Sequence, residues 1–542
     1  MPPPSISDYV QITHDGQTKE LIGTDGSRLY LNQEAPRSIA QVAIEGGPIA
    51  TIPVPVKNPF IQDVSPDGST LLVSPVDDHN LWSFQILGGS HRRLVDERVV
   101  SAAWSPDGSF AAYSTTNGEI YRIRADGSDA QKMLSADADD AESANDLVWS
   151  PDGGTLRFTK HHELWEVSTR GSVPRQLLPE STPLCCGHWT PDGAFFIFLS
   201  GDSLLKSPHY LPGAQLWALD ERHGLLRRPP AEALRLTSGP TRWGSPIPSK
   251  DGKKIFARGV TIRGELERFN SRSKNFQPFL GGISAEFVSY SNDGKMMAYV
   301  SFPEGILWRA NSDGSNPVQL THPPIYPKLL RWSPDGTQLL FLDTPPGGNP
   351  KTYTISSDGG KPKPLLPEEK RPVTDSNWSP DGRKIVFSSC DCLEARVASK
   401  SVINILDLTS HQVTKLPGSD GTWSPRWSPD GRLIAALSLV GSKDTRVYDL
   451  ETKRWSVLPT GRIDWPTWSH DSRSIYFLRL QDNPGVFNIS LTGGRVERVA
   501  ELDGFHHTGW FNGWMGLDPT DTPLLLRNVG SEDIYALILE RK

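Results

Sequence analysis

Short runs of apolar residues, many alternating with polar ones, recur along the chain between turn-forming residues. The stretch 329–366 shows the order, with runs at 330–332, 339–342, 352–355 and 364–366. Alternation with a period of two is the pattern of a strand with one buried face, and a continuous apolar run fits a strand covered on both faces. The pattern therefore predicts a unit of four strands joined by turns and one longer loop.

The turn between the first two strands of this unit carries Ser-Pro-Asp-Gly, usually preceded by Trp. Full or near copies have their aspartates at Asp25, Asp67, Asp107, Asp152, Asp192, Asp251, Asp293, Asp335, Asp381, Asp430, Asp471 and Asp521. Consecutive copies lie 40 to 59 residues apart, and strand-rich repeats of this length are typical of β-propeller blades. We therefore predict an all-β chain, a β-propeller with twelve four-stranded blades. Since one ring rarely exceeds about eight blades, two six-bladed rings are favoured over the alternative of one large single ring.

The residues of the motif suit a tight turn. Proline restricts φ, the aspartate carboxylate caps nearby backbone N–H groups, and glycine accepts a positive φ. One aspartate per turn, without further oxygen ligands at fixed spacing, favours capping over calcium binding or catalysis. The preceding tryptophan either stacks on a ligand or packs between blades, and its fixed place in the repeat favours packing. These tryptophans are Trp104, Trp149, Trp189, Trp332, Trp378, Trp427 and Trp468.

The two ends of the chain predict how the fold closes. Residues 10–14 match the outer strand at 318–322, and residues 533–539 are predicted to be a third strand with no fourth after it. We expect the N-terminal strand, residues 9–14, to close the last blade, because an unpaired sheet edge would recruit other chains. Division of the twelve motifs into two sets of six predicts a first six-bladed propeller at 1–284 and a second at 285–542. No linker separates the halves near residue 285, so we expect the two rings to be closely joined.

Composition narrows the function classes. The chain has 542 residues, of which 37% are hydrophobic and 22% charged, and a net charge of -7. This charge gives no reason to expect general nucleic-acid affinity. No run of about 18 apolar residues predicts a membrane span, and residues 1–11 lack the basic and apolar regions of a signal peptide. We expect a monomer without a nucleic-acid partner.

The four cysteines form two close pairs, Cys185 with Cys186 and Cys390 with Cys392. Adjacent cysteines rarely bridge each other. The pairs therefore predict unpaired thiols or one bridge between the pairs, and a soft-metal site with His188 is the alternative.

Most long insertions fall in the loop between the second and third strands and in the loop between blades, which share one face of a propeller. Loop elaboration on one face is how propellers acquire binding sites, so we predict that a ligand or protein partner binds this loop-rich face. Adjacent histidines in a strand point in opposite directions, which disfavours a metal site, and the acidic residues suit a solvated loop better than a calcium site. We predict no metal and no cofactor. The candidate binding residues are Asp137, Asp139, Asp140, His161, His162, His506, His507 and Trp510.

Catalytic motifs give no support for an enzyme. The sequence has no Gly-x-Ser-x-Gly nucleophile elbow and no glycine loop that would hold a phosphate before a helix. We therefore predict a non-enzymatic binding, sensor or scaffold module that recognises a protein, peptide or glycan, with no catalytic residues. One alternative is a glycan lyase or hydrolase with a composite site in the central funnel. Another is a purely structural module of a larger regulator.

The repeat also resembles a known family. Over nearly the whole chain, the repeat is similar to the WD-type propeller repeats of TolB and its relatives. Its order is Trp-Ser-Pro-Asp-Gly, then Leu-x-Phe, then Ile/Leu-Trp/Tyr, then a second Asp-Gly and Leu-Thr. More specifically, the chain resembles the C-terminal propeller region of acidobacterial winged-helix regulators related to CadC. The matching stretches lie at 9–13, 184–187, 283–286, 299–301, 303–305 and 523–527. The resemblance implies a periplasmic or extracytoplasmic sensor domain, and it supplies no catalytic residues. The sequence shows neither a winged helix nor a membrane helix, so DNA binding is not implied.

Overall fold

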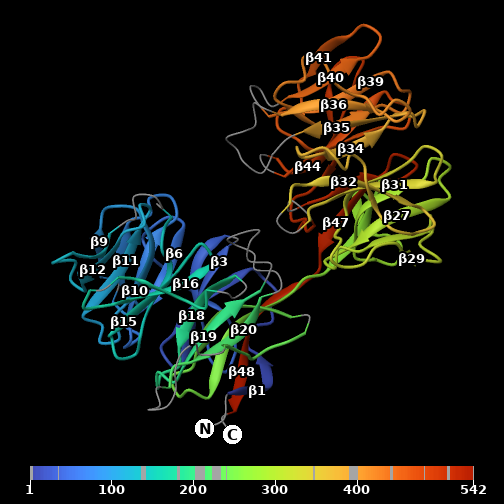
Figure 1. Cartoon of the computed structure of the whole chain (residues 1–542). Helices are drawn as coiled ribbons and strands as arrows, with labels where there is room; N and C mark the ends of the chain where they lie inside the picture. Colours follow the sequence, from blue (N-terminus) through green and yellow to red (C-terminus); the bar gives the residue numbers. More distant parts are fainter. Residues whose placement is uncertain are drawn as a thin grey trace. The chain divides into compact units, whose positions relative to one another are not determined.

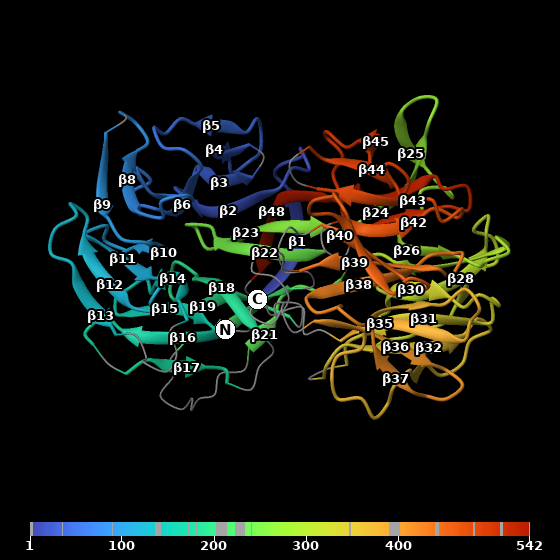
Figure 2. The same ribbon diagram turned by 90° about the horizontal axis from the view of Figure 1, so that it is seen from above.

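The computed structural model describes residues 4–540 except 35, 89, 136–141, 172, 180–182, 202–213, 223–232, 240, 346–347, 390–400, 440–443, 481–482 and 510–512. Within these residues the chain forms twelve four-stranded antiparallel sheets and no helix, which confirms the predicted all-β fold of twelve blades. No helix in the described part is long and apolar enough to cross a membrane. The chain divides into two compact units, which are described separately (Figures 1 and 2).

Unit 1 comprises residues 1–261 and 530–542 and contains six of the sheets. From the innermost to the outermost strand, these are β2 (Lys19–Thr24), β3 (Arg28–Glu34), β4 (Arg37–Ala43), β5 (Ala50–Ile52); β6 (Pro59–Val64), β7 (Thr70–Pro75), β8 (Leu81–Gln85), β9 (His91–Val95); β10 (Val99–Trp104), β11 (Phe110–Thr115), β12 (Ile120–Arg124), β13 (Gln131–Leu134); β14 (Asn145–Trp149), β15 (Thr155–Lys160), β16 (Glu163–Ser168), β17 (Arg175–Leu177); β18 (Leu184–Trp189), β19 (Phe195–Ser200), β20 (Gln215–Asp220), β21 (Ala233–Arg235); and β22 (Arg242–Pro248), β23 (Lys254–Thr261), β48 (Ser531–Glu540), β1 (Ser5–Gln11).

Unit 2 comprises residues 262–529 and contains the other six sheets. In the same order, these are β26 (Ala285–Tyr290), β27 (Met296–Ser301), β28 (Leu307–Asn311), β29 (Val318–Gln319); β30 (Lys328–Trp332), β31 (Gln338–Asp343), β32 (Lys351–Ser356), β33 (Lys363–Pro364); β34 (Thr374–Trp378), β35 (Lys384–Ser389), β36 (Val402–Asp407), β37 (Val413–Lys415); β38 (Thr422–Trp427), β39 (Leu433–Ser438), β40 (Thr445–Asp449), β41 (Arg454–Leu458); β42 (Asp464–Trp468), β43 (Ser474–Arg479), β44 (Gly485–Ser490), β45 (Val496–Glu501); and β46 (Met515–Leu517), β47 (Pro523–Asn528), β24 (Gly264–Asn270), β25 (Asn275–Pro278).

Each unit is a closed ring of six blades. In unit 1 the innermost strands touch in the cycle β2, β6, β10, β14, β18, β22 and back to β2. In unit 2 the cycle is β26, β30, β34, β38, β42, β46 and back to β26. Apolar side chains between successive sheets make the cores, such as Leu339 and Phe341 of β31, both about 1% exposed or less. The fold therefore contains two six-bladed rings and not one large ring.

The N-terminal strand closes a blade, as predicted, but the blade is built differently. Strand β1 pairs with β48, with Gln11 opposite Tyr535, and β48 pairs in turn with β23 from the middle of the chain. Strand β47 pairs with β24, with Gly264 opposite Asn528. The chain therefore crosses between units twice, after Thr261 and after Val529. The units divide at these positions and not between residues 284 and 285, because each ring is completed by strands from a distant part of the sequence.

The repeated turns have the predicted capping structure. In the turn after β34, the Ser379 hydroxyl donates to Asp381 Oδ1 at 2.6 Å, and the same oxygen accepts the backbone N–H of Arg383 at 3.1 Å. The motif tryptophans pack between blades, as predicted. The indole N–H of Trp332 donates to the backbone carbonyl of Ser289 in the preceding blade at 3.0 Å, and that of Trp468 donates to Arg426 at 3.0 Å.

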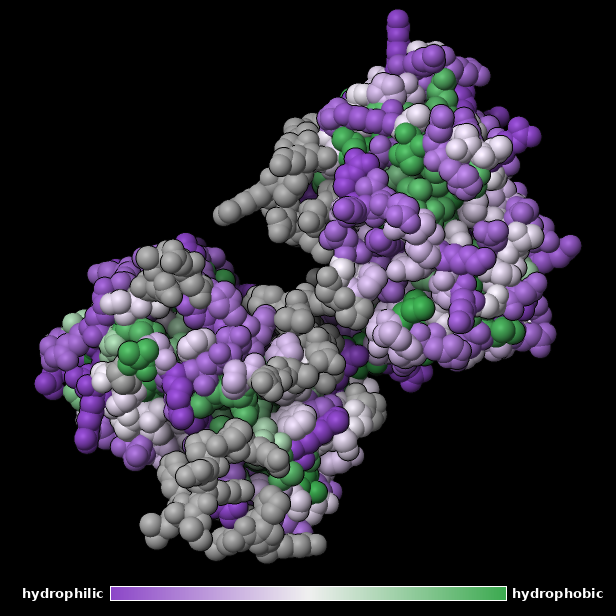
Figure 3. Space-filling view, viewed as in Figure 1, coloured by the Kyte–Doolittle hydropathy of each residue, from purple (hydrophilic) through white to green (hydrophobic). Residues whose placement is uncertain are grey.

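Hydrophilic residues cover most of the face seen in Figure 3, and the hydrophobic residues on that face form small separate groups. Apolar residues scattered in this way are usual on protein surfaces and need no partner.

Candidate functional site

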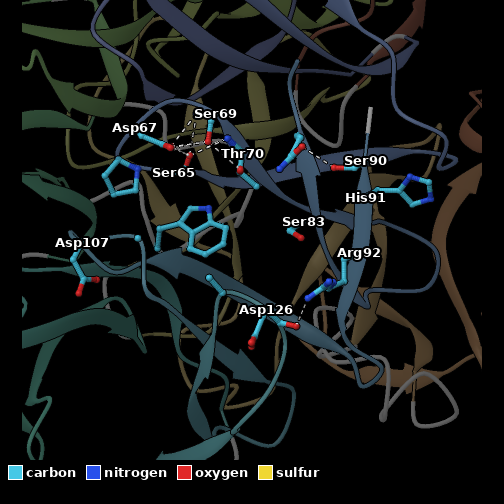
Figure 4. A pocket seen from close by; sticks show the side chains of 15 residues that line it. Ser65, Asp67, Ser69, Thr70, Ser83, Ser90, His91, Arg92, Asp107 and Asp126 are labelled. Carbon is cyan, nitrogen blue, oxygen red and sulfur yellow. Dashed lines mark hydrogen bonds between the residues drawn. The ribbon is translucent and has the colours of Figure 1, made fainter. Parts of the chain in front are cut away.

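The first cavity lies between the second and third blades of unit 1 and has a volume of about 590 Å³. Figure 4 shows that its walls are largely Asp-Gly turns, including those of Asp67 and Asp126. The Ser65 hydroxyl donates to Asp67 Oδ1 at 2.6 Å, and Arg92 donates to the backbone carbonyl of Asp126 at 2.8 Å. These side chains hold the blades and turns together, so we assign this cavity a structural role.

The second cavity lies within unit 2 and has a volume of about 810 Å³, which is in the range of pockets that enclose ligands. Four neighbouring blades contribute to its wall through the first residues of their innermost strands, and other strands and loops of the unit supply the rest. The lining residues are Leu329, Asp375, Trp423, Ser424, Arg426, Leu437, Thr460, Gly461, Arg462, Asp464, Trp465, Arg479, Leu480 and His507. We call this set of residues the unit 2 cavity.

A β-bulge in each of these innermost strands brings the side chains into the cavity. Leu329, Asp375, Ser424 and Trp465 occupy equivalent positions with φ between 47° and 56°, and each lies where the pairing register of its strand shifts. An extra residue in one strand redirects its side chain, and bulges are frequent next to functional sites. A positive φ is uncommon for residues other than glycine, so its recurrence is a property of the blade. The single sequence gives no sign of these bulges.

A buried ion pair forms part of the wall. Arg426 Nη1 lies 2.8 Å from Asp375 Oδ1, and Nη2 donates to Oδ2 at 3.0 Å. The Ser424 hydroxyl donates to the same Oδ2 at 2.6 Å, and Arg331 Nη2 lies 3.9 Å from Oδ1. Burial alone would raise the pKa of the Asp375 carboxyl, but the charges of Arg426 and Arg331 outweigh it and hold that pKa below its usual range. Burial and the neighbouring Arg426 lower the pKa of Arg331 to about 9.

His507, a candidate from the sequence, also lines the unit 2 cavity. Neither of its ring nitrogens has a hydrogen-bond partner among the described residues, although both atoms are buried. Burial, together with the charge of Arg527, lowers the pKa of His507 to about 4, so the ring is neutral at pH 7. A buried polar group without a partner is costly, and a bound ligand would supply the missing hydrogen bonds.

The unit 2 cavity contains a serine, a histidine and an aspartate, but they do not form a catalytic relay. The Ser424 hydroxyl donates to Asp375 and not to His507. A serine nucleophile requires a base within hydrogen-bond reach. Among the described residues, these three side chains therefore do not form a Ser-His-Asp relay.

The other sequence candidates are placed elsewhere or lie outside the described residues. His161 and His162 are the two central residues of the hairpin between β15 and β16, with φ of 52° and 59°, so they lie in a turn and not in a strand. The ring of His161 pairs with Glu142, and His506 is exposed. Those outside the described residues are Asp137, Asp139, Asp140 and Trp510.

The cysteines differ from the expectation. Cys185 and Cys186 form a disulfide with each other, whereas the sequence favoured free thiols or a bridge between the two pairs. A β-bulge at Cys186, with φ of 52°, makes the bridge possible because both side chains then lie on one side of the strand. Cys390 and Cys392 lie outside the described residues.

Comparison with known proteins supports the fold and leaves the activity open. No family model matches the chain. It is 32% identical over 130 residues to the Tol-Pal system protein TolB of Ruthia magnifica, which covers 23% of this chain and 29% of that protein. It is 27% identical over 234 residues to a Bacillus subtilis protein named as the uncharacterized peptidase YuxL, covering 39% of this chain and 31% of that protein. The aligned stretches thus span about a third of each relative's length.

Two solved structures are similar. A TolB from Agrobacterium tumefaciens is 23% identical with a TM-score of 0.39 and covers 49% of this chain and 99% of its own. The tricorn protease is 15% identical with a TM-score of 0.35 and covers 88% of this chain and 50% of its own. The twelve four-stranded blades and the stretch aligned with TolB together show that this chain has a TolB-like β-propeller fold.

Proposed function

We propose that the chain is a non-enzymatic protein-binding module and that the unit 2 cavity holds a peptide segment of its partner. The observation that carries this proposal is the cavity of about 810 Å³, with two tryptophans, Trp423 and Trp465, and with ring nitrogens of His507 that have no partner among the described residues. Aromatic side chains supply apolar contact area, and a few polar groups fix the orientation of a ligand. One relative is named as a Tol-Pal system protein and another as a peptidase, which favours a polypeptide over a glycan.

The charges of the unit 2 cavity favour a ligand with a carboxylate. Three arginines line it, Arg426, Arg462 and Arg479, against the two aspartates Asp375 and Asp464. Arg331 adds a fourth positive charge beside Asp375. Arg462 is exposed, so its side chain is available to a ligand that enters from solvent, and a guanidinium binds a carboxylate in a bidentate manner.

We infer further that the module acts outside the cytoplasm as a sensor domain. The disulfide between Cys185 and Cys186 supports an oxidising compartment, and the resemblance to the propeller region of CadC-related regulators supports the sensor role.

Selection of random peptides against the purified chain, followed by calorimetry, tests the proposal. We expect peptides with an acidic residue to bind at the micromolar level or tighter, and Arg462→Glu to weaken binding by about tenfold or more, which is 1.4 kcal/mol. The matched control is Arg454→Glu, on the exposed outer strand β41 of the same unit. Absence of any binding peptide, or equal affinity of both variants, would contradict the proposal.

The relative named as a peptidase makes hydrolysis the second candidate. The hydrogen bond from Ser424 to Asp375 argues against a serine peptidase in this cavity. Incubation of the selected peptides with the chain, followed by mass spectrometry, separates the two functions: intact peptides support binding, and cleavage that is lost in His507→Ala supports the peptidase.

A further inference from the structure

A second group of chemically reactive side chains lies in unit 1. The carboxylate of Asp146 and the sulfurs of Cys185 and Cys186 have ligand atoms within 4.8 Å of one another. Asp146 belongs to β14 and the cysteines to β18, so two adjacent blades supply the group. Neither the proposed peptide site nor the closure of the ring uses these residues.

The same bulge that shapes the unit 2 cavity brings this group together. Asp146 and Cys186 each have a φ of 52° and lie at the register shifts of β14 and β18. The backbone N–H of Cys186 acts as a hydrogen-bond donor to the Asp146 carboxylate, and the carboxylate lies beside the sulfurs. The arrangement is built by the fold and does not depend on a flexible surface chain.

Solvent reaches the group from one side. Cys185 is buried, at 5% exposure, whereas Cys186 is partly exposed and Asp146 is exposed. Burial raises the pKa of the Glu20 carboxyl, from β2, and the charge of Asp146 adds to this rise, so the two carboxylates lie close enough to interact.

We propose that Asp146, Cys185 and Cys186 form a redox-gated site for a borderline-soft divalent metal ion of the Zn²⁺ type. Two thiolates and a carboxylate are ligands that Zn²⁺ accepts, with water in the fourth position of a tetrahedron. In the disulfide, neither sulfur is a thiolate, so the site is closed. Reduction opens it.

The reaction balances with a dithiol as the reductant. The dithiol transfers two electrons and two protons to the Cys185–Cys186 bond, which breaks to two thiols while the dithiol becomes a disulfide. Metal binding then displaces the two thiol protons to solvent. A disulfide reoxidises the pair: it accepts two electrons from the two thiolates and two protons from solvent to become a dithiol, the Cys185–Cys186 bond forms again and the metal ion leaves. Metal content therefore reports the redox state of this pair.

The test uses the full chain with Cys390→Ser and Cys392→Ser, so that only the pair in unit 1 remains. This protein is prepared in air or reduced with a phosphine and desalted without oxygen, and Co²⁺ is titrated as the probe. We expect no titratable thiol and no cobalt band in the oxidised form. The reduced form is expected to have two thiols and to bind one Co²⁺ with a thiolate-to-cobalt charge-transfer band, which Zn²⁺ abolishes.

Two variants separate a metal site from two adventitious thiols. Asp146→Asn is expected to weaken Co²⁺ binding by at least tenfold, within the range of about 10–100-fold that supporting residues contribute at metal sites. Asp129→Asn, at an exposed aspartate of the same unit, is expected to change nothing. The proposal would be overturned if the reduced protein had two thiols but no cobalt band, or if the oxidised form showed the band. Equal Co²⁺ affinity of both variants would also overturn it. So would free thiols in the protein prepared in air, or loss of the folded circular dichroism signal on reduction.

Discussion

In each Ser-Pro-Asp-Gly turn, two short side chains replace the hydrogen bonds that a tight turn leaves unmade. Ser379 donates to Asp381 and accepts the backbone N–H of Lys384 at 2.9 Å, while Asp381 accepts the N–H of Arg383. Asp381→Ala removes the acceptor, and we expect it to lower the free energy of unfolding by about 1 kcal/mol. Asp381→Asn keeps one acceptor oxygen and should lose less. Urea denaturation of both variants measures the difference, and equal losses would show that charge, and not the hydrogen bonds, stabilises the turn.

At the same scale, His507 makes the stability of unit 2 sensitive to acid. Its pKa is lowered to about 4 in the folded chain and is about 6.5 in an unfolded one. The unfolded chain therefore binds more protons between these values, so the stability that neutral His507 contributes is complete above pH 6.5 and is lost as the pH falls toward 4. His507→Gln should lose less stability than the parent chain between pH 7.5 and 4.5 in urea denaturation. His411→Gln, at an exposed position, is the control, and an identical pH profile for all three proteins would refute the assignment.

At the scale of strands, the ends of the chain are joined by more than the β1–β48 ladder. The side chain of Lys19 is fully buried, and its Nζ donates to the backbone carbonyl of Glu532 at 2.8 Å and to Asp15 at 2.5 Å. The Thr13 hydroxyl donates to Asp533 at 2.8 Å. These bonds tie the N-terminal segment to β48 within unit 1, so the closing strand is held by buried polar groups as well as by its backbone.

Removal of residues 1–11 tests the closing strand. We expect the truncated chain to be less stable in urea and to self-associate in size-exclusion chromatography, because the edge of β48 becomes unpaired. A synthetic peptide of residues 4–14 should restore the monomer. Val10→Ala, at an exposed position of β1, should behave as the parent chain. An unchanged monomer after truncation would mean that the edge needs no cover.

The strands themselves were predictable from the sequence, and their partners at the ring closure were not. The runs at 330–332, 339–342 and 352–355 coincide with β30, β31 and β32, because alternation and turn residues are local signals. The pairing of β48 with β23 joins residues about half the chain length apart, such as Lys254 and Ile538. The apolar pattern of β48 does not identify this partner, because the third strands of all blades share the same pattern. For the same reason the unit 2 cavity was predictable only through His507. Its bulges and the Asp375–Arg426 pair arise from tertiary geometry.

At the scale of the whole molecule, the strand exchange predicts which fragments fold. All six sheets of unit 2 are made from residues 262–529, so this fragment contains every strand of a closed ring. A fragment of residues 285–542 lacks β24 and β25 and carries β48 without its partners. We therefore expect 262–529 to be a soluble monomer with a cooperative urea transition, and 285–542 to aggregate or to unfold without cooperativity. Residues 1–261 alone lack β48, and they should fold only when residues 530–542 are supplied through a short linker. If 285–542 proved as stable as 262–529, the pairing of β24 with β47 would be dispensable, and a boundary near residue 285 would describe the chain better than the one at Thr261.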